Sequence, residues 1–278
     1  MKTILIPTDF SDDAKHAARY GAAMAKDLNV EKIILYNAYS LPLASEMTWA
    51  LMESDNLKRA SEQGVKSERT SLLPFCGPNI IVEAVSEFGF MAEQIDHFAK
   101  EHQVDLVIMG ISDSNKLEQV LIGSSALTVI QNTDIPVLVV PPDAVWKHIE
   151  QIAWACDFKK IEENAPIEAI KEVLKMTGAR LHVVHNEPDL KNYNPELVEE
   201  DVFIHDMFKE EQPEYALLTG DDLATTIDGY VKSHDIQWLI SIPKEHGWWD
   251  GLFAKDNVKN LAFHTHIPML CLKKINLN

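Results

Sequence analysis

The sequence predicts an α/β protein of two tandem domains, each a doubly wound, mostly parallel sheet of about five strands. Short apolar runs alternate with helical patterns along the whole chain, which is typical of parallel βαβ units. Runs such as "LVIM" (106–109) are apolar at every position, as expected of strands covered on both faces. The order of these segments occurs twice, which indicates an internal repeat.

The elements of the first half follow from their residue patterns. Ser11 precedes a helical pattern whose apolar face is made of small residues such as Ala14, Ala18 and Ala25. Helices are expected over residues 12–28, 48–73, 91–102 and 124–131. Strands are expected over residues 2–7, 32–38, 79–85, 105–110 and 136–140.

The second half repeats this order. Asp9 of "TILIPTDFS" aligns with Asp157 of "QIAWACDFK", an offset of 148 positions (157 minus 9). Pro136 of "NTDIPVLVV" aligns with Pro268 of "HTHIPMLCL", an offset of 132 positions (268 minus 136), so the second half is shorter in its middle. We expect a first domain over residues 1–142 and a second over 149–278, joined near "PPDAVWKH".

Composition excludes several classes of protein. Acidic residues outnumber basic ones 43 to 25, which gives a net charge of −18 and argues against nucleic-acid partners. No apolar run approaches the ~20 residues that span a bilayer, and the apolar start of the chain is too short for a signal peptide. The three cysteines have no regular spacing and do not make a disulfide framework. We therefore expect a cytoplasmic protein with no membrane or nucleic-acid partner.

Three segments of the first half should meet beyond the carboxyl ends of the strands, where doubly wound sheets bind their ligands. They are Pro7-Thr8-Asp9 after the first strand, Ala38 at the end of the second strand, and residues 109–125 after the fourth. Asp9 could accept hydrogen bonds from ribose hydroxyls or hold a metal. The alternative is that Asp9 only caps the first helix.

The third segment has the features of a phosphate loop. Gly110 leaves a strand without a side chain, and Gly123 precedes a helix that begins with Ser124 and Ser125. The N–H groups in the first turn of a helix have no partner within the helix, and they point along the positive end of the helix dipole. The alternative is an ordinary connection in which Ser124 is the helix cap.

Together these stretches resemble the universal stress protein family. The phosphate motif of that family reads Gly-x2-Gly-x9-Gly-[Ser/Thr] after a strand that ends in Met. Met109, Gly110 and the pair Gly123-Ser124 fall at this spacing. The segments "IPTDFS" and "IPVLVVP" are further matches, and the chain as a whole is similar to a tandem member of the family.

The resemblance implies an adenine nucleotide α-hydrolase-like fold, with ATP and Mg²⁺ as the cofactor in some members and an adaptor-like dimer without nucleotide in others. The cofactor-binding residues that it implies are Pro7, Thr8, Asp9, Ala38, Met109, Gly110, Asp113, Gly123, Ser124 and Ser125. No catalytic or metal-ligating residue is assigned. Any ATP hydrolysis is expected to be slow, because no general base or arginine finger stands out.

One position departs from the motif, because Asp113 stands where the second glycine is expected. Two like charges ~4 Å apart repel by about 1 kcal/mol in water and by about 4 kcal/mol at an effective dielectric constant near 20. A bridging Mg²⁺ or Mn²⁺, or the charge of Lys116, could offset this repulsion. Otherwise Asp113 is a solvated carboxylate in a degenerate site.

The second half lacks the motif. Its two glycines and its serine are replaced by Ile242, Lys255 and Asp256. The loop carries Trp248 and Trp249 in the sequence "PKEHGWWDGLFAKDN", where they would crowd a phosphate. We expect no nucleotide in this half. The tryptophans either fill their own crevice or form a contact patch for a partner.

Three functions therefore compete. The first is a cytoplasmic stress-response protein with a partly degenerate ATP site in its first domain, and the second is a non-enzymatic interaction module without nucleotide. A metal or small-ligand sensor based on His264 and His266, together with His246 or His185, is the third. The final strands of the halves, "PVLVVP" and "PMLCLK", could pair with each other and make the chain a pseudo-dimer, and homo-oligomers are compatible with this arrangement.

Overall fold

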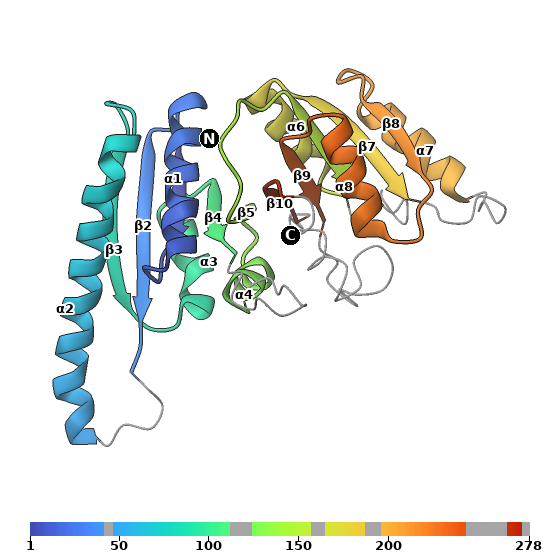
Figure 1. Cartoon of the computed structure of the whole chain (residues 1–278). Helices are drawn as coiled ribbons and strands as arrows, with labels where there is room; N and C mark the ends of the chain where they lie inside the picture. The colour runs from blue at the N-terminus through green and yellow to red at the C-terminus, as the bar shows by residue number, and fades with distance from the viewer. Residues whose placement is uncertain (42–46, 112–123, 157–164, 187–195, 243–265, 274–278) are drawn as a thin grey trace. The chain divides into compact units, whose positions relative to one another are not determined.

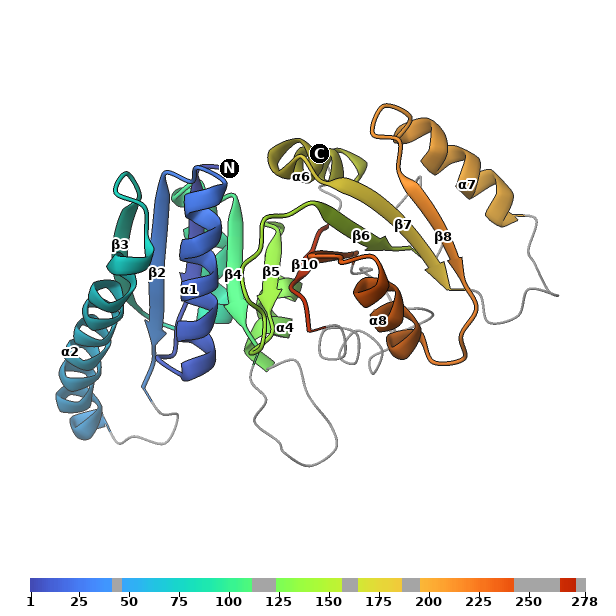
Figure 2. The ribbon, with the colours of Figure 1, turned by 45° about the horizontal axis from the view of Figure 1, so that its top comes forward.

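The computed structural model describes residues 1–41, 47–111, 124–156, 165–186, 196–242 and 266–273. Contacts divide these residues into two compact units, one that ends at Trp146 and one that begins at Lys147. Each unit contains five parallel strands, and helices connect successive strands in the first unit and, up to β9 (Trp238–Ser241), in the second (Figures 1 and 2). The predicted α/β class and the mostly parallel sheets are confirmed.

The first unit contains the elements that build the candidate site. In chain order they are β1 (Thr3–Pro7), α1 (Asp12–Asp27), β2 (Lys32–Tyr39), α2 (Met47–Leu72), the short 3-10 helix η1 (Leu73–Phe75), β3 (Ile81–Phe88), α3 (Met91–Glu101), β4 (Leu106–Gly110), α4 (Ser124–Asn132) and β5 (Val137–Val140). Its strand order is β3-β2-β1-β4-β5. The chain passes from β1 to β2 and β3 on one side, and the connection from β3 then crosses back to β4 on the other side of β1. Sheets of this kind bind ligands at the carboxyl ends of those strands.

Helix α1 forms where the sequence predicts it. The Ser11 hydroxyl accepts a hydrogen bond from the Ala14 N–H at 3.2 Å, which satisfies one of the free donors of the first turn. The predicted small residues of α1 are buried against the sheet, at positions 14, 17, 18, 21, 22 and 25. Figure 1 shows α1 crossing one face of the sheet while α3 lies on the other face. The sheet is therefore covered on both faces, as its apolar strands require.

Several strand boundaries differ from the prediction by one to three residues, most of all in β3. β3 begins at Ile81 rather than at residue 79, because the Ile80 N–H donates to the Gly77 carbonyl at 3.1 Å and closes a turn there. β2 extends by one residue to Tyr39, since its pairing with β3 continues to Phe88. Boundaries of this kind depend on pairing between strands and not on local composition.

The described residues of the second unit repeat the alternation of strands and helices as far as β9. The elements are β6 (Gln151–Ala155), α6 (Ile167–Thr177), β7 (Arg180–Asn186), α7 (Glu196–Met207), β8 (Glu214–Leu218), α8 (Leu223–Ser233), β9 (Trp238–Ser241) and β10 (Met269–Cys271). Their order is β10-β9-β6-β7-β8. Among the described residues no helix is long and apolar enough to cross a membrane.

Strand registers reproduce the internal repeat. Thr3 of β1 lies opposite Lys32 of β2, and Gln151 of β6 lies opposite Arg180 of β7. Both residues of the second pair are 148 positions after their counterparts in the first, the same offset that relates Asp9 to Asp157. The first two strands of each unit therefore have the same pairing register, which fixes which residues correspond at their carboxyl ends.

The shorter middle of the second half lies around α7. Ile4 is opposite Leu106 in the first unit, and Ile152 is opposite Trp238 in the second, so the later strands follow the smaller offset. α2 has 26 residues whereas α7 has 12. The second unit has thus shortened the helix that follows its second strand and has kept the strand pairing.

Candidate functional site

A cavity of about 180 Å³ lies at the carboxyl ends of β1, β2 and β4 in the first unit. One part of its lining is apolar and is made of Pro7, Ala14, Ala38, Met91, Met109 and Ala126. The other part is polar and is made of Thr8, Asp9, Ser11, Asp13, Asn37 and Ser125. Gly110 completes the lining. A concave site with an apolar wall and a few convergent polar groups is typical of small-ligand pockets.

The structure brings most of the sequence-predicted site residues to this cavity. Those that line it are Pro7, Thr8, Asp9, Ala38, Met109, Gly110 and Ser125. Ser124 is the first residue of α4. Asp113 and Gly123 lie outside the described residues, and so does Lys116. The three predicted segments therefore meet where the topology of the sheet places them.

Several lining residues were not predicted as site residues. They are Ser11, Asp13, Ala14, Asn37, Met91 and Ala126. Ser11 and Asp13 could have been found, because the helix that follows β1 must begin at the same edge of the sheet. Asn37 precedes Ala38 and lies at the end of β2. Met91, the first residue of α3, carries no sequence signal that relates it to the other segments.

Gly110 allows the end of β4 to lie directly against the first turn of α1. A Cβ atom at this position would overlap the carbonyl oxygen of Asp13 and would lie 2.7 Å from its carbonyl carbon. The backbone of α1 cannot give way as a flexible side chain could. The sequence relates Gly110 to the approach of a phosphate, and the structure supplies a second reason for glycine, the contact between β4 and α1.

Thr8 positions the end of β1 through all of its polar groups. Its hydroxyl donates to Glu68 Oε2 at 2.7 Å and accepts from the Phe10 N–H at 3.0 Å. Its N–H donates to the Tyr36 carbonyl at 2.8 Å, and its carbonyl accepts from Asn37 Nδ2 at 2.6 Å. Since each group already has a partner, Thr8 forms part of the cavity wall and fixes the turn that carries Asp9.

Asp9 lies at the edge of the cavity in a defined orientation. Its Oδ1 accepts a hydrogen bond from the Ser11 N–H at 3.0 Å, an arrangement that ties the carboxylate to the start of α1. Phe10, between these residues, has φ = 66° and so adopts the left-handed conformation that non-glycine residues rarely use. Such conformations cluster at functional sites, because the surrounding structure must hold them in place.

The N-termini of two helices contribute to the cavity, and their electrostatics differ. The first turn of α1 carries Asp12 and Asp13, which neutralise the positive end of that helix dipole. The first turn of α4 has no acidic residue, and Ser125 from that turn lines the cavity. An anion is therefore favoured at α4 and disfavoured at α1.

The equivalent edge of the second unit is built differently. Asn186 occupies the position of Ala38, and its side chain bonds both backbone groups of Gly220, from Nδ2 to the carbonyl at 3.0 Å and from the N–H to Oδ1 at 3.1 Å. Ile242 stands at the position of Gly110, as the sequence predicts. Asp157, Trp248, Trp249, Lys255 and Asp256 lie outside the described residues.

No group of three or more His, Cys, Asp or Glu residues with the geometry of a metal site occurs in the described ranges. His266 is exposed and has φ = 50°, while His246 and His264 lie outside these ranges. His185 is buried at the end of β7, where its Nδ1 lies 2.9 Å from the Cys156 carbonyl oxygen. This contact is structural and leaves the metal-sensor hypothesis without support from the described residues.

Residues 1–141 match the sequence model of the universal stress protein family. The chain belongs to the universal stress protein family. One universal stress protein of Methanocaldococcus jannaschii is 34% identical over 142 residues, which are 50% of this chain and 81% of that protein. Another from the same organism is 30% identical over 158 residues, 50% of this chain and 94% of that protein.

Solved structures of universal stress proteins share the fold over nearly the full chain. The universal stress protein of Archaeoglobus fulgidus DSM 4304 has a TM-score of 0.74 at 18% sequence identity, and the match covers 98% of each chain. The likeness therefore extends through the second unit, beyond the residues that the family sequence model matches. At this identity it shows the fold and not the ligand.

Proposed function

We propose that the first unit of this universal stress protein binds ATP with Mg²⁺ in the cavity at the ends of β1, β2 and β4, and that the second unit binds no nucleotide. One observation carries the proposal. The cavity joins an apolar wall to the start of α4, whose first turn has no acidic residue and presents Ser125. That combination suits a ligand with an aromatic base at one end and phosphates at the other.

Each part of the nucleotide has a matching part of the cavity. Ala38, Met91 and Met109 offer apolar surface to the base. The Asp9 carboxylate lies at the rim, where it can accept from ribose hydroxyls. Ser125 and the amide groups at the start of α4 would hold the phosphates.

The acidic lining makes the Mg²⁺ complex the favoured form of the ligand. Asp9 and Asp13 both line the cavity, so a bare polyphosphate would be repelled by about 1 kcal/mol or more per close pair of charges. Mg²⁺ prefers oxygen ligands and would neutralise part of this charge. No side chain is assigned as a general base, so we expect at most slow hydrolysis.

The proposal extends to the setting of the protein. We place its stress-response role in the cytoplasm, supported by three cysteines that all lie in described segments and form no disulfide. We also retain domains over residues 1–142 and 149–278, pairing of their final strands as a pseudo-dimer, self-association of chains, and no nucleic-acid partner. Intrachain cross-linking between β5 and β10 would test the pseudo-dimer.

A second function is favoured by a specific observation. The acidic pair Asp9 and Asp13, together with the bridge from Asn186 to Gly220, fits a non-enzymatic interaction module that has lost nucleotide binding in both units. In that case the shared fold would serve only to present surfaces to a protein partner. Asp113 belongs to the same comparison, because it replaces a glycine of the family motif.

Calorimetric titration with ATP, with and without Mg²⁺, separates the two functions. We expect the parent protein to bind ATP with Mg²⁺ and Asp113→Gly to bind it about tenfold more tightly, since one repulsive carboxylate is removed. Ser125→Asp should abolish binding, because it places a negative charge at the start of α4. The matched control is Asn132→Asp, which adds the same charge at the far end of α4, on an exposed residue.

Two results would decide against the nucleotide. Absence of binding by both the parent protein and Asp113→Gly would leave the interaction module as the function. Binding that is unaffected by Ser125→Asp would place the nucleotide outside this cavity.

A further inference from the structure

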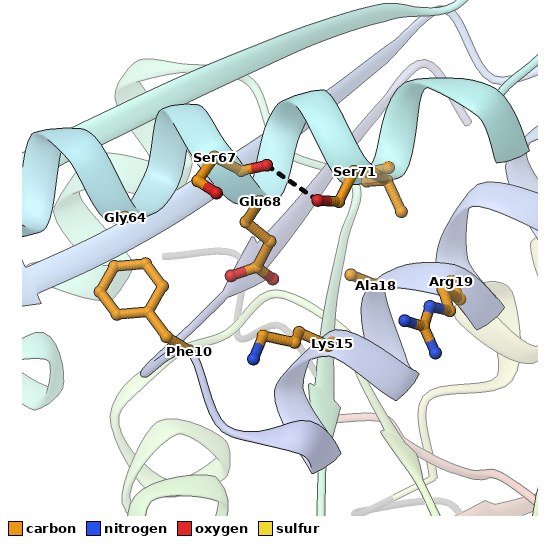
Figure 3. A pocket seen from close by; sticks show the side chains of 9 residues that line it. Phe10, Lys15, Ala18, Arg19, Gly64, Ser67, Glu68 and Ser71 are labelled. Atoms are coloured by element: carbon orange, nitrogen blue, oxygen red, sulfur yellow. Dashed lines mark hydrogen bonds between the residues drawn. The ribbon is translucent and has the colours of Figure 1, made fainter.

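A second cavity of the first unit, about 260 Å³ in volume, lies between α1 and α2. Figure 3 shows Lys15 and Arg19 on α1 facing Ser67, Glu68 and Ser71 on α2 across this space. None of these five residues lines the candidate nucleotide cavity. The α1–α2 cavity therefore has its own set of charged and hydroxyl groups.

Glu68 is the unusual member of the lining. Glu68 is only 6% exposed, and Figure 3 shows its carboxylate directed away from α2 toward α1. Oε2 accepts the Thr8 hydroxyl, but Oε1 is buried without any hydrogen-bond partner in the described part of the chain. Buried acceptors are nearly always paired, and an unpaired one costs about 1–3 kcal/mol. Oε1 thus calls for a hydrogen-bond donor.

The opposite wall supplies positive charge. Lys15 and Arg19 line the cavity, and Lys15 is near enough to lower the pKa of Glu68, which burial raises. The ion pair between Lys15 and Asp12 is 3.7 Å long, and the Asp12 side chain is fully exposed, so this pair competes weakly with a ligand. A ligand in the cavity would contact two cations on one side, and on the other side the Glu68 carboxylate, whose Oε1 lacks a hydrogen-bond donor in the described part of the chain.

Hydroxyl groups and an aromatic ring complete the site. The Ser71 hydroxyl donates to the Ser67 carbonyl at 3.1 Å along α2 (dashed line in Figure 3), which leaves its oxygen able to accept. The ring of Phe10 packs on Gly64, where a Cβ would lie 2.5 Å from a ring carbon, and it closes one end of the cavity. These groups limit the space to a small ligand.

We infer that the α1–α2 cavity binds inorganic phosphate, with Lys15 and Arg19 holding its anionic oxygens and Glu68 Oε1 accepting its P–OH group. The ligand must combine negative charge with a proton donor. Sulfate has no proton to donate at neutral pH, and phosphate monoesters lose theirs with a second pKa of about 6. Orthophosphate keeps at least one P–OH group at neutral pH. Glu68 is therefore the residue that sets specificity.

Calorimetry of the whole 278-residue chain with phosphate and with sulfate, at matched ionic strength and neutral pH, tests this inference. We expect phosphate to bind at least about tenfold more tightly than sulfate, because a sulfate oxygen would face an unpaired buried acceptor. Glu68→Gln should remove the preference, since an amide N–H can donate to either anion. Arg19→Ala should weaken both anions and keep their ratio, whereas Lys66→Ala, which changes an exposed cation on α2 outside the cavity, should change neither.

Several results would overturn the inference. They are no binding of either anion, equal binding of both by the parent protein, or a phosphate preference that survives Glu68→Gln. Loss of phosphate binding in Ser125→Asp but not in Arg19→Ala would assign the anion to the nucleotide cavity. If Glu68→Gln does not fold, the parent preference and the Arg19→Ala result still decide the matter. The nucleotide proposal can fail or hold independently, because its titrations use ATP and other variants.

Discussion

The Thr8 carbonyl in the first unit accepts a hydrogen bond from Asn37, and the Cys156 carbonyl in the second lies 2.9 Å from a ring nitrogen of His185. In both units the N–H of the same residue donates to the neighbouring strand, to the Tyr36 carbonyl in one and the Val184 carbonyl in the other. The backbone at the ends of the first two strands is therefore equivalent. What differs is the side chains that make or omit contacts around it.

One residue further along β2 and β7 the two units diverge. Ala38 lines an open cavity, whereas Asn186 uses its whole amide to bridge to Gly220. At the end of β4 the first unit has Gly110, and the second has Ile242 at the corresponding position. The two units thus share their strand register, while a few side chains decide whether the edge of each sheet can accept a ligand.

The largest effect is expected for Gly110→Ala, which tests whether the first unit needs glycine at this position. The new Cβ would overlap the backbone of Asp13, so α1 or β4 must shift, and we expect a loss of about 3 kcal/mol in the free energy of unfolding, together with loss of ATP binding. Urea unfolding and ATP calorimetry measure these effects. Gly229→Ala in α8 is the matched control, because nothing lies within 4 Å of its Cβ, and it should stabilise by up to about 1 kcal/mol. Equal losses in both variants would refute the close-contact explanation.

A reciprocal pair of substitutions tests the bridge in the second unit. Asn186→Ala removes two hydrogen bonds to Gly220 and should cost about 2 kcal/mol of unfolding free energy. Ala38→Asn introduces the second unit's residue into the first, and we expect it to fill part of the cavity and weaken ATP binding about tenfold. Unfolding and calorimetric titration provide the readouts. Unchanged ATP affinity in Ala38→Asn would show that this edge does not contact the nucleotide.

A smaller effect is expected at two helix caps, one in each unit, whose counterparts Pro166 and Phe90 form no side-chain hydrogen bond. Ser11→Ala removes the acceptor of the Ala14 N–H and should cost about 1 kcal/mol. Asp222→Ala removes the acceptor of the Thr225 N–H, 2.8 Å long, and should cost a similar amount. Only Ser11→Ala should also alter ATP binding, since Ser11 lines the cavity. Equal effects on ATP binding would contradict the assignment of the site to the first unit.

The smallest effect concerns the pH dependence of stability. Burial raises the pKa of Glu68 above 4.5, so the folded state binds the extra proton and its stability decreases as pH rises through the folded pKa. Burial lowers the pKa of His182 below 6.5, against the opposing effect of Glu214 and with the help of His234 and Arg180. Stability from His182 is complete above 6.5 and is lost as pH falls through its folded pKa.

Unfolding midpoints between pH 6.5 and pH 4.5 check both signs. The stability that Glu68→Gln gains over the parent protein should be smallest at the acidic end, because the parent's Glu68 is protonated there. His182→Gln should lose less stability than the parent protein as pH falls. If the stability of both variants depended on pH in the same way as that of the parent protein, both assignments would be contradicted.

The sequence predicted the α/β class, the doubled order of elements and most of the site, because each rests on local pattern. Alternating apolar runs predicted the strands, and Ser11 with its small-residue helix predicted α1. The meeting of Asp9, Ala38 and Ser125 followed from a rule about the edges of parallel sheets. The sequence could not predict Met91, because this residue reaches the cavity only through the way α3 packs on the sheet.

The sequence by itself determined the repeat, the replacement of the second unit's glycines, and the family to which the chain belongs. Only the tertiary structure showed that Gly110 is needed for the contact between β4 and α1, that Thr8 is fully bonded, and that Glu68 leaves one oxygen without a donor. The physical reason is that apolar periodicity and motif spacing are properties of neighbouring residues. The partners of a buried polar atom come from segments far apart in the chain, and only the packed fold brings them together.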